Sequence, residues 1–153
     1  MKLQGDRLIP APVEATWTAL NDPDMLKACI TGCESIEMTG DNEFLATLVV
    51  RIGPVNTRFK GRLLLTDIVL RNSYTIRFEG QGGVAGFGKG SADIRLLPEH
   101  GDSATRLHYV AEAQMGGKIA RIASRLVDSA AGRITDSFFD AFEARMAGDA
   151  KTR

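Results

Sequence analysis

The sequence is poor in the residue types that mark several protein classes. Its 153 residues include only two cysteines, too few for a disulfide scaffold, and two histidines. The 19 basic residues balance the 19 acidic ones, so no net charge attracts nucleic acid or anionic lipid at long range. No apolar run approaches the roughly 20 residues of a membrane span, and the first residues lack a signal peptide's apolar stretch. We therefore expect a reduced, soluble, cytoplasmic protein.

Two segments come close to known binding motifs but lack the spacing or the neighbouring structure that each motif requires. Residues 83–90 nearly match a phosphate-binding loop, but Gly90 stands where a hydroxyl is needed and a strand-like pattern follows instead of a helix. Cys29 and Cys33 are one residue too far apart for a redox pair, and no second pair completes a zinc site. We expect no cofactor, no metal and no catalytic set. The six glycines of residues 80–90 predict a wide, mobile turn that gates a cavity mouth.

The hydropathy pattern changes from helical to alternating and back. A short strand within residues 3–9 precedes two short helices, one from 13 to 20 after Pro12 and one from Asp22-Pro23 to Cys29. From Glu43 on, five segments alternate apolar and polar residues, which predicts an antiparallel meander covered on one face. An apolar stripe then runs from residue 118 to about 146, predicting a helix of ~40 Å that covers the sheet. The stripe comprises Ile119, Leu126, Ala130, Ile134, Phe138 and Phe142, with Val127 and Ala131 beside them.

This order of elements predicts an α+β fold in a single domain. The domain covers residues 1–147 and a short polar tail covers 148–153.

The two faces of the predicted meander differ in chemistry. Asp93, His108 and Glu112 fall on the outer face, whereas the covered face offers apolar side chains and a few hydroxyls, of Thr57, Tyr74 and Tyr109. Acid–base catalysis needs a titratable group near the substrate, so this interior better suits an apolar ligand oriented by a hydroxyl. The candidate cavity walls are Phe44, Leu48, Phe59, Leu63, Tyr74, Ile76, Phe78, Ile94, Tyr109, Ile119, Ile122 and Phe138, with Phe87 as the gate. Core filling is the alternative role for each of them.

Charge on the last helix is opposite to what the helix dipole favours. Basic residues line the polar face at its start (Lys118, Arg121, Arg125 and Arg133), and acidic residues line its end (Asp136, Asp140 and Glu143). The pattern fits either a solvated face or a surface that meets an anionic membrane or a protein partner. Ile122 and Phe139 fall nearer the polar side of this helix and are candidates for the same surface.

Motifs spread over nearly the whole chain resemble those of the carbon monoxide dehydrogenase G-subunit family, within the START/polyketide-cyclase (SRPBCC) superfamily. Thr31 replaces the family's usual proline, and Ala123 stands where a glycine is common. The matching residues are Trp17 with Leu20, Asn21-Asp22-Pro23, Gly32-Cys33-Glu34, Gly53-Pro54-Val55, Phe59 with Gly61, Gly117 to Ala120, and Phe138-Phe139.

The resemblance implies a helix-grip fold: a curved antiparallel sheet of six to seven strands around a long C-terminal helix, with two short helices near the N-terminus. It also implies a hydrophobic cavity for a lipid or quinone. The implied role is accessory, in membrane recruitment or maturation of molybdenum-containing carbon monoxide dehydrogenase-type oxidoreductases, with peripheral contact at the inner face of the cell membrane.

Three functions stay open at this point. The first is a non-catalytic carrier of an apolar ligand. The second is a cyclase- or hydratase-like enzyme, which requires a bulge to turn Asp93, His108 or Glu112 inward. The third is a pure interaction module whose interior is filled core.

Overall fold

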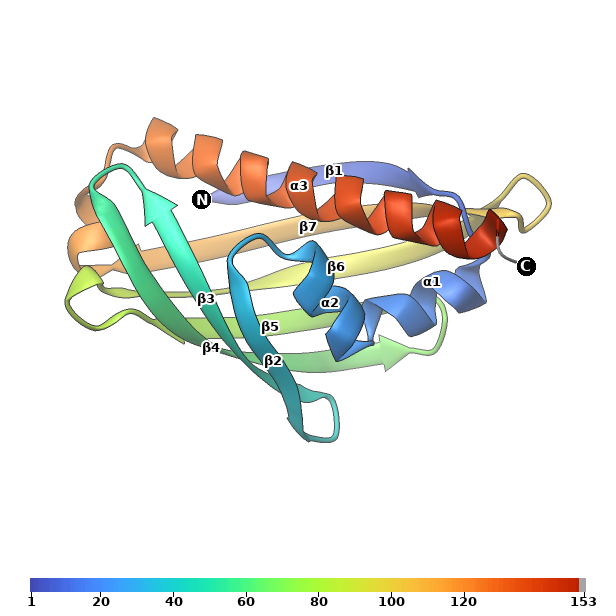
Figure 1. The fold of residues 1–153 in the computed structure, drawn as a ribbon, viewed down its shortest axis with the longest axis horizontal. Coiled ribbons are helices and arrows are strands. Elements are labelled where there is room, and N and C mark those ends of the chain that lie inside the picture. The colour runs from blue at the N-terminus through green and yellow to red at the C-terminus, as the bar shows by residue number, and fades with distance from the viewer. Residues whose placement is uncertain (152–153) are drawn as a thin grey trace.

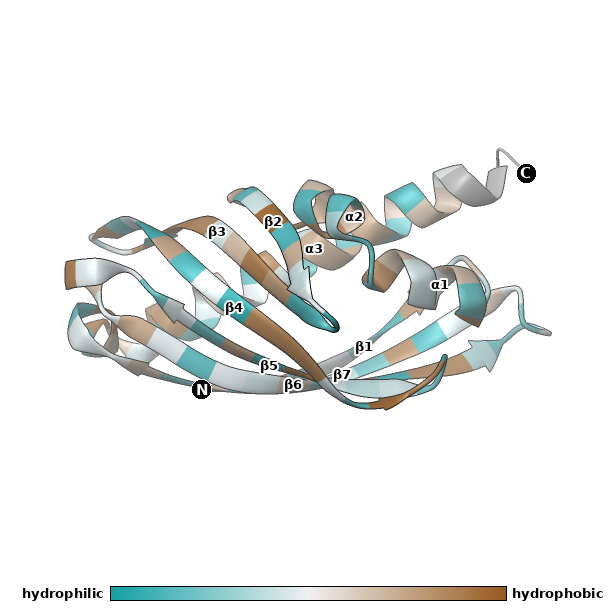
Figure 2. Ribbon diagram, turned by 90° about the horizontal axis from the view of Figure 1, so that it is seen from below, coloured by the Kyte–Doolittle hydropathy of each residue, from teal (hydrophilic) through white to brown (hydrophobic). Residues whose placement is uncertain are grey.

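The computed structural model describes residues 1–151, with side chains through residue 148. Seven antiparallel strands form one curved sheet in the order β1-β7-β6-β5-β4-β3-β2, and three α-helices lie on one side of it (Figures 1 and 2). The strands are β1 (Lys2–Ile9), β2 (Cys33–Gly40), β3 (Glu43–Ile52), β4 (Val55–Val69), β5 (Ser73–Gln81), β6 (Phe87–Glu99) and β7 (Ala104–Gly116). The helices are α1 (Val13–Leu20), α2 (Pro23–Cys29) and α3 (Ser124–Lys151), with short 3-10 turns η1 (Gly83–Ala85) and η2 (Gly117–Arg121).

The structure confirms the predicted α+β fold and its number of strands. The five alternating segments are β3 to β7, and Asp22 caps α2 by accepting a hydrogen bond from the Asp24 amide at 3.0 Å. The alternating segments do not include β2, the edge strand. Its alternation is weak because Ile36 is its one buried side chain.

The last helix begins later than its apolar stripe predicts. Residues 117–121 form η2, Ile122 is extended, and α3 starts at Ser124. Close packing of two backbones explains the break: a Cβ on Gly117 would lie 2.6 Å from the Gly86 Cα, and Gly117 itself has a φ of +77°. Ile119 is therefore buried in η2 and not on the helix. At its other end α3 continues to Lys151, past the expected boundary at 147, and residues 152 and 153 lie outside the described part.

Two separate core clusters hold the two ends of α3. Near its start, Val127 and Ala130 pack with Ile52, Phe59 and Ile119. The second cluster contains Phe139, Phe142 and Met146 from α3, together with Ile9, Leu20, Leu96 and Leu107 from the sheet and α1.

Two positions of the predicted stripe, and one position outside it, need correction. Leu126 and Ile134 are exposed, at 46% and 39%, whereas Phe139, expected on the polar side, is buried. The reason is that the buried side of α3 changes around the helix as it passes from one cluster to the other.

Several glycines make room for aromatic rings on neighbouring strands. Gly5 pairs with Tyr109 and Gly90 pairs with Phe78, and a Cβ on either glycine would lie within 3 Å of the opposite ring or its hydroxyl. Gly116 pairs with Phe87 in the same way. The glycines of residues 80–90 therefore serve ring packing as well as the turn, where Gly83 and Gly86 have positive φ.

Candidate functional site

A groove of about 590 Å³ lies between the middle of α3 and the sheet. Its walls come from the loop after α2, the start of β2, the end of β3, and the part of α3 between the two core clusters. The lining residues are Thr31, Gly32, Cys33, Glu34, Val49, Val50, Arg51, Ala130, Arg133, Ile134 and Ser137.

The loop wall of the groove depends on Gly32. Its φ is +80°, and a Cβ there would lie 2.4 Å from the Val49 carbonyl oxygen. The Gly32 carbonyl in turn accepts a hydrogen bond from the Val49 amide at 2.8 Å. Because only glycine permits this approach, the loop lies directly against β3 and forms one side of the groove.

The covered face of the sheet is not fully packed beneath α3. The helix makes its most extensive contacts with β1, β3 and α2, toward the two sides of the sheet. Leu48 on β3, and Ile76 and Phe78 on β5, are only half-buried and belong to none of the described core clusters. We call these three residues the inner apolar strip. Val50 lines the groove and lies on the same face of β3 as Leu48.

The predicted wall residues fall into separate groups. Phe59, Ile119 and Ile122 belong to the cluster at the start of α3, and Ile94, Tyr109 and Phe138 to the cluster at its end. Phe44 and Leu63 pack with Ile36 in a third cluster under β2. Leu48, Ile76 and Phe78 form the inner apolar strip. None of the predicted wall residues lines the groove itself.

Two predicted residues have other surroundings. Tyr74 is buried with its ring 5.2 Å from the Trp17 ring, edge to face, and burial raises the pKa of its hydroxyl. Phe87, the expected gate, is the first residue of β6. Its ring lies over Gly116, and its side chain is 49% exposed. The predicted wall residues did not include Val50, which lines the groove. The sequence did indicate it, because Val50 continues the alternation of Leu48 on the covered face. The charge pattern placed Arg133 on the polar face of the last helix but not in a groove, and nothing in the sequence indicated Ser137.

Two ionisable groups of the groove lining, Glu34 and Cys33, are paired or desolvated. Arg58 donates from Nε to Oε1 of Glu34 and from Nη2 to Oε2 at 3.1 Å, and this lowers the pKa of Glu34. Burial raises the pKa of the Cys33 thiol. Cys29 and Cys33 are both free thiols, and no three His, Cys, Asp or Glu side chains in the described part of the chain are placed to share a metal ion.

The three residues of the enzyme alternative lie on the outer face of the sheet. The Thr75 hydroxyl donates to Asp93 at 2.8 Å, His108 lies 3.7 Å from Asp6, and Glu112 lies 3.6 Å from Lys2. No bulge turns any of them toward α3, because β6 and β7 pair in continuous register. The structure does not bring these residues to the groove.

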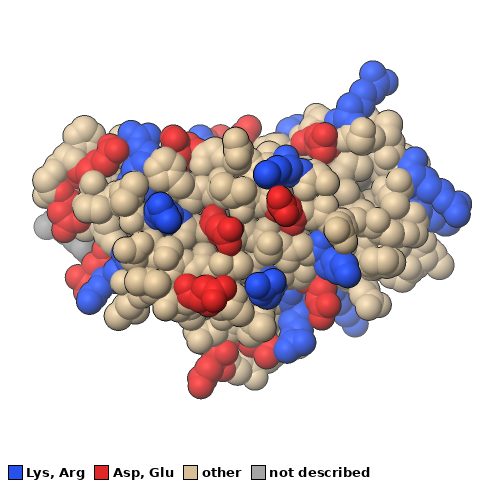
Figure 3. All heavy atoms as spheres, turned by 180° about the vertical axis from the view of Figure 1, so that it is seen from behind, with Lys and Arg blue, Asp and Glu red and all other residues tan. Residues whose placement is uncertain are grey.

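A second feature is one end of the molecule, where three loops meet. A Cβ on Gly53 of the β3–β4 turn would lie about 4 Å from the Leu126 and Ile122 side chains, and η1 packs on η2 (Figure 1). Residues 51–57, 80–90 and 113–127, which we call the basic end, contain five basic residues and no acidic one. Lys118, Arg121 and Arg125 are among them, and Lys and Arg side chains project from this end in Figure 3. Three exposed apolar residues lie there as well: Val84 at 84%, Phe87 and Leu126.

No helix in the described residues has both the length and the hydropathy needed to cross a bilayer.

A curved antiparallel sheet closed over by a long C-terminal helix defines the helix-grip proteins of the START type. A conserved protein from Geobacillus kaustophilus has this fold, with 30% identity, a TM-score of 0.89, and coverage of 97% of this chain and 96% of its own. The chain belongs to the family of carbon monoxide dehydrogenase G subunits (CoxG), whose model matches residues 5–147.

More distant structures share the fold. A START superfamily protein from Mycobacterium smegmatis is 13% identical with a TM-score of 0.73, and the alignment covers 96% of this chain and 97% of that one. An aromatase/cyclase from a Streptomyces species is 14% identical with a TM-score of 0.68, over 100% of this chain and 96% of its own. Among curated proteins no significant match is found.

Proposed function

We propose that this protein binds an apolar ligand, a lipid or quinone-like molecule, in the groove and along the inner apolar strip. It acts as a non-catalytic accessory carrier for a molybdenum oxidoreductase of the carbon monoxide dehydrogenase type. The observation that carries the proposal is the inner apolar strip: Leu48, Ile76 and Phe78 lie on the covered face yet stay half-buried. Burying apolar surface contributes roughly 25 cal/mol per Å², so a ligand that covers these side chains gains binding free energy.

The packing of α3 supports this proposal over a filled interaction module. In a module whose interior is only core, the middle of α3 would bury a large apolar residue, as its start buries Val127 and its end buries Phe142. Instead Ile134 is exposed at the groove between the two clusters. Membership in the CoxG family supports the accessory role, because the family is named for a subunit of a dehydrogenase.

Native mass spectrometry of the purified protein, before and after lipid extraction, tests the carrier function. We expect a bound apolar molecule in the first spectrum, and uptake of a lipid or quinone by the extracted protein. Repeated recovery of an empty protein that takes up neither would reject the proposal.

The second part of the proposal is that the basic end meets an anionic surface, either the inner leaflet of the cell membrane or the partner enzyme. In a chain with no net charge, five basic residues without an acidic one are a local concentration of positive charge. Each basic residue near an anionic leaflet contributes about 1 kcal/mol. The exposed Val84 and Leu126 supply apolar contact beside these charges.

Sedimentation with anionic vesicles tests this surface. The Arg121→Glu, Arg125→Glu double variant should lose vesicle binding, whereas Arg95→Glu, an exposed change on the outer face of the sheet, should retain it. If the parent protein does not sediment, its co-purification with the partner oxidoreductase is compared for the same variants. Binding that none of them alters would reject the basic end as a contact surface.

A further inference from the structure

We infer that the hydroxyl of Tyr74 binds the polar group of the ligand, a neutral oxygen such as a ketone carbonyl on an otherwise apolar molecule. The inference rests on the proposed carrier function and adds a specificity-determining residue and the chemistry of the group that it recognises. Two observations carry it: Tyr74 lies beside the inner apolar strip, and its hydroxyl has no hydrogen-bond partner among the described residues.

Tyr74 lies on the same face of the central strand as the inner apolar strip. Tyr74, Ile76 and Phe78 alternate along β5, the middle strand of the seven, so all three side chains are directed toward the helices. In the register of the sheet, Tyr74 pairs with Ile94 on β6, which pairs in turn with Tyr109 on β7. This cross-strand row therefore lies next to the row of Ile76 on the covered face.

The Tyr74 side chain is buried, but its hydroxyl is not bonded to the protein. The residue is 4% exposed, and its ring meets the Trp17 ring edge to face at 5.2 Å. The hydroxyl forms no hydrogen bond with any described residue, whereas each fully enclosed side-chain oxygen or nitrogen in this part of the chain has a partner. The Tyr74 oxygen therefore borders a space on the covered face. Tyrosine hydroxyls in such places usually have a partner, and a ligand oxygen supplies it.

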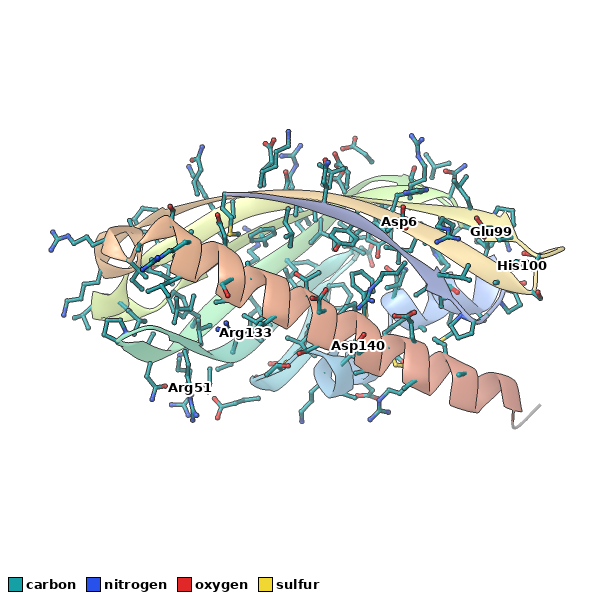
Figure 4. The ribbon with its side chains drawn as sticks, turned by 90° about the horizontal axis from the view of Figure 1, so that it is seen from above. Asp6, Arg51, Glu99, His100, Arg133 and Asp140 are labelled. Carbon is teal, nitrogen blue, oxygen red and sulfur yellow. The ribbon has the colours of Figure 1, made fainter. Side chains whose placement is uncertain are left out.

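The ligand group beside Tyr74 is neutral because the central strands offer it no charged side chain. On β5, β6 and β7 the residues of the covered face are uncharged, and the charged ones alternate onto the outer face. Asp6 and Glu99, labelled in Figure 4, lie on that outer face, where Nη1 of Arg106 is 3.5 Å from Oδ1 of Asp6 and its Nε is 3.1 Å from Oε1 of Glu99. An ion beside Tyr74 would have no counter-charge on these strands, which makes its burial unfavourable.

The protonation state of Tyr74 suits a donor. Burial raises the pKa of its hydroxyl, so the group keeps its proton at neutral pH. A neutral phenol donates one hydrogen bond, and a carbonyl oxygen accepts one without carrying a charge. A single placed polar group in an apolar site is enough to fix the orientation of a ligand.

The other tyrosine of the chain differs in where its hydroxyl lies. The Tyr109 ring stacks on Phe139 of α3, and its hydroxyl oxygen lies against Gly5 of β1, 2.7 Å from the position of a Cβ there. Because β1 and β6 flank β7 on opposite sides, this hydroxyl is directed away from β5 and Tyr74. Tyr109→Phe therefore removes a hydroxyl from the same cross-strand row and leaves the inferred contact in place, which makes it the matched control.

A matched pair of probes and the Tyr74→Phe variant test the contact on the full chain. The probes are methyl nonyl ketone and the alkene in which a methylene group replaces its carbonyl oxygen. The fluorescence of Trp17, the single tryptophan of the chain and a neighbour of Tyr74, measures both affinities, and native mass spectrometry confirms the bound mass. We expect Tyr74→Phe to weaken ketone binding about five-fold, or about 1 kcal/mol, and to leave alkene binding unchanged. Tyr109→Phe should alter neither affinity.

Two further measurements separate a ligand contact from a structural role of the hydroxyl. The carbonyl stretching band of the bound ketone should lie at lower frequency in the parent than in Tyr74→Phe, because a hydrogen bond weakens the carbonyl double bond. The melting temperature of Tyr74→Phe should be no lower than that of the parent, because no hydrogen bond to a described residue is lost. A large drop would show that the hydroxyl is bonded within the protein and would overturn the inference.

The outcomes separate this inference from the proposal beneath it. If Tyr74→Phe changes ketone and alkene affinity equally, or leaves the carbonyl band in place, Tyr74 does not bind the polar group, while the carrier function stands. If neither probe binds to the parent protein, the carrier function fails as well.

Discussion

Arg7 on β1 and Asp140 on α3 are joined by a hydrogen-bonded ion pair of 3.0 Å, although 133 positions separate them in the sequence. The same guanidinium donates to the Asp136 carbonyl at 3.1 Å, lies 3.6 Å from Glu143 and sits 5.4 Å from the centre of the Phe139 ring. These contacts fasten α3 to the β1 edge of the sheet, on the side away from the groove. They also give the acidic residues of α3 a partner, which the charge pattern of the helix alone does not reveal.

We expect Arg7→Ala to lower the free energy of unfolding by about 1–2 kcal/mol. The side chain is 25% exposed, so the ion pair is partly screened, but the cation–π contact and the hydrogen bond to the backbone carbonyl are lost with it. Urea denaturation measures the change. Arg95→Ala, which removes an exposed arginine from the outer face, should stay within about 0.5 kcal/mol of the parent. Equal effects of the two variants would show that Arg7 does not hold the helix.

Stability should depend on pH through Glu143. Burial raises its pKa above the ordinary 4.5, with Asp140 adding to the effect and Arg7 opposing it. A raised pKa means that the folded state binds the proton more tightly, so this stabilisation is present below pH 4.5 and is lost as the pH rises through the folded-state pKa. Glu143→Gln should therefore gain stability relative to the parent as the pH rises across that window. Unfolding curves at a series of pH values test this.

The contribution of Glu34 to stability should change with pH in the opposite direction to that of Glu143. Its pairing with Arg58 lowers its pKa, so its contribution is present above pH 4.5 and is lost as the pH falls through the folded-state pKa. Glu34→Gln should lose stability relative to the parent at neutral pH and approach it in acid. If both variants gained stability relative to the parent as the pH rises, or both lost it, burial of Glu143 and pairing of Glu34 would not be the causes of their pKa shifts.

Two glycine substitutions should change stability in opposite directions. A Cβ on Gly90 would lie 2.0 Å from the Glu112 carbonyl oxygen and 2.8 Å from the Phe78 ring, so Gly90→Ala must displace backbone and should cost about 1–3 kcal/mol. Gly132 lies inside α3 with nothing within 4 Å of its would-be Cβ, so Gly132→Ala should add about 0.5–1 kcal/mol. Thermal melting distinguishes them, and a tolerated Gly90→Ala would show that the sheet yields there.

Enlarging the inner apolar strip should block ligand uptake at little cost in stability. Leu48→Trp places a larger ring where the side chain is only half-buried, and we expect a change in unfolding free energy below about 1.5 kcal/mol together with loss of the bound molecule in native mass spectrometry. Phe142→Ala, in the fully buried cluster, should instead cost about 3–5 kcal/mol. A large loss of stability in Leu48→Trp would mean that the strip is closely packed core.

The sequence by itself determined every strand except β2, the two short helices, and the face on which the residues of the predicted strands lie. These depend on interactions between residues a few positions apart: side chains alternate with a period of two along a strand, and Asp22 and Pro23 start α2 from within its own first turn. The same alternation placed Asp93, His108 and Glu112 on the outer face.

Tertiary structure decided where α3 begins, which of its sides is buried, and where the groove lies. The start at Ser124 follows from the contact of Gly86 with Gly117, and Phe139 is buried because the Tyr109 ring and Arg7 from distant strands lie against it. Arg133 lines the groove only because the Gly32 loop comes to lie against β3 opposite α3. Such contacts join residues far apart in the chain, and a periodic pattern carries no information about which of them meet.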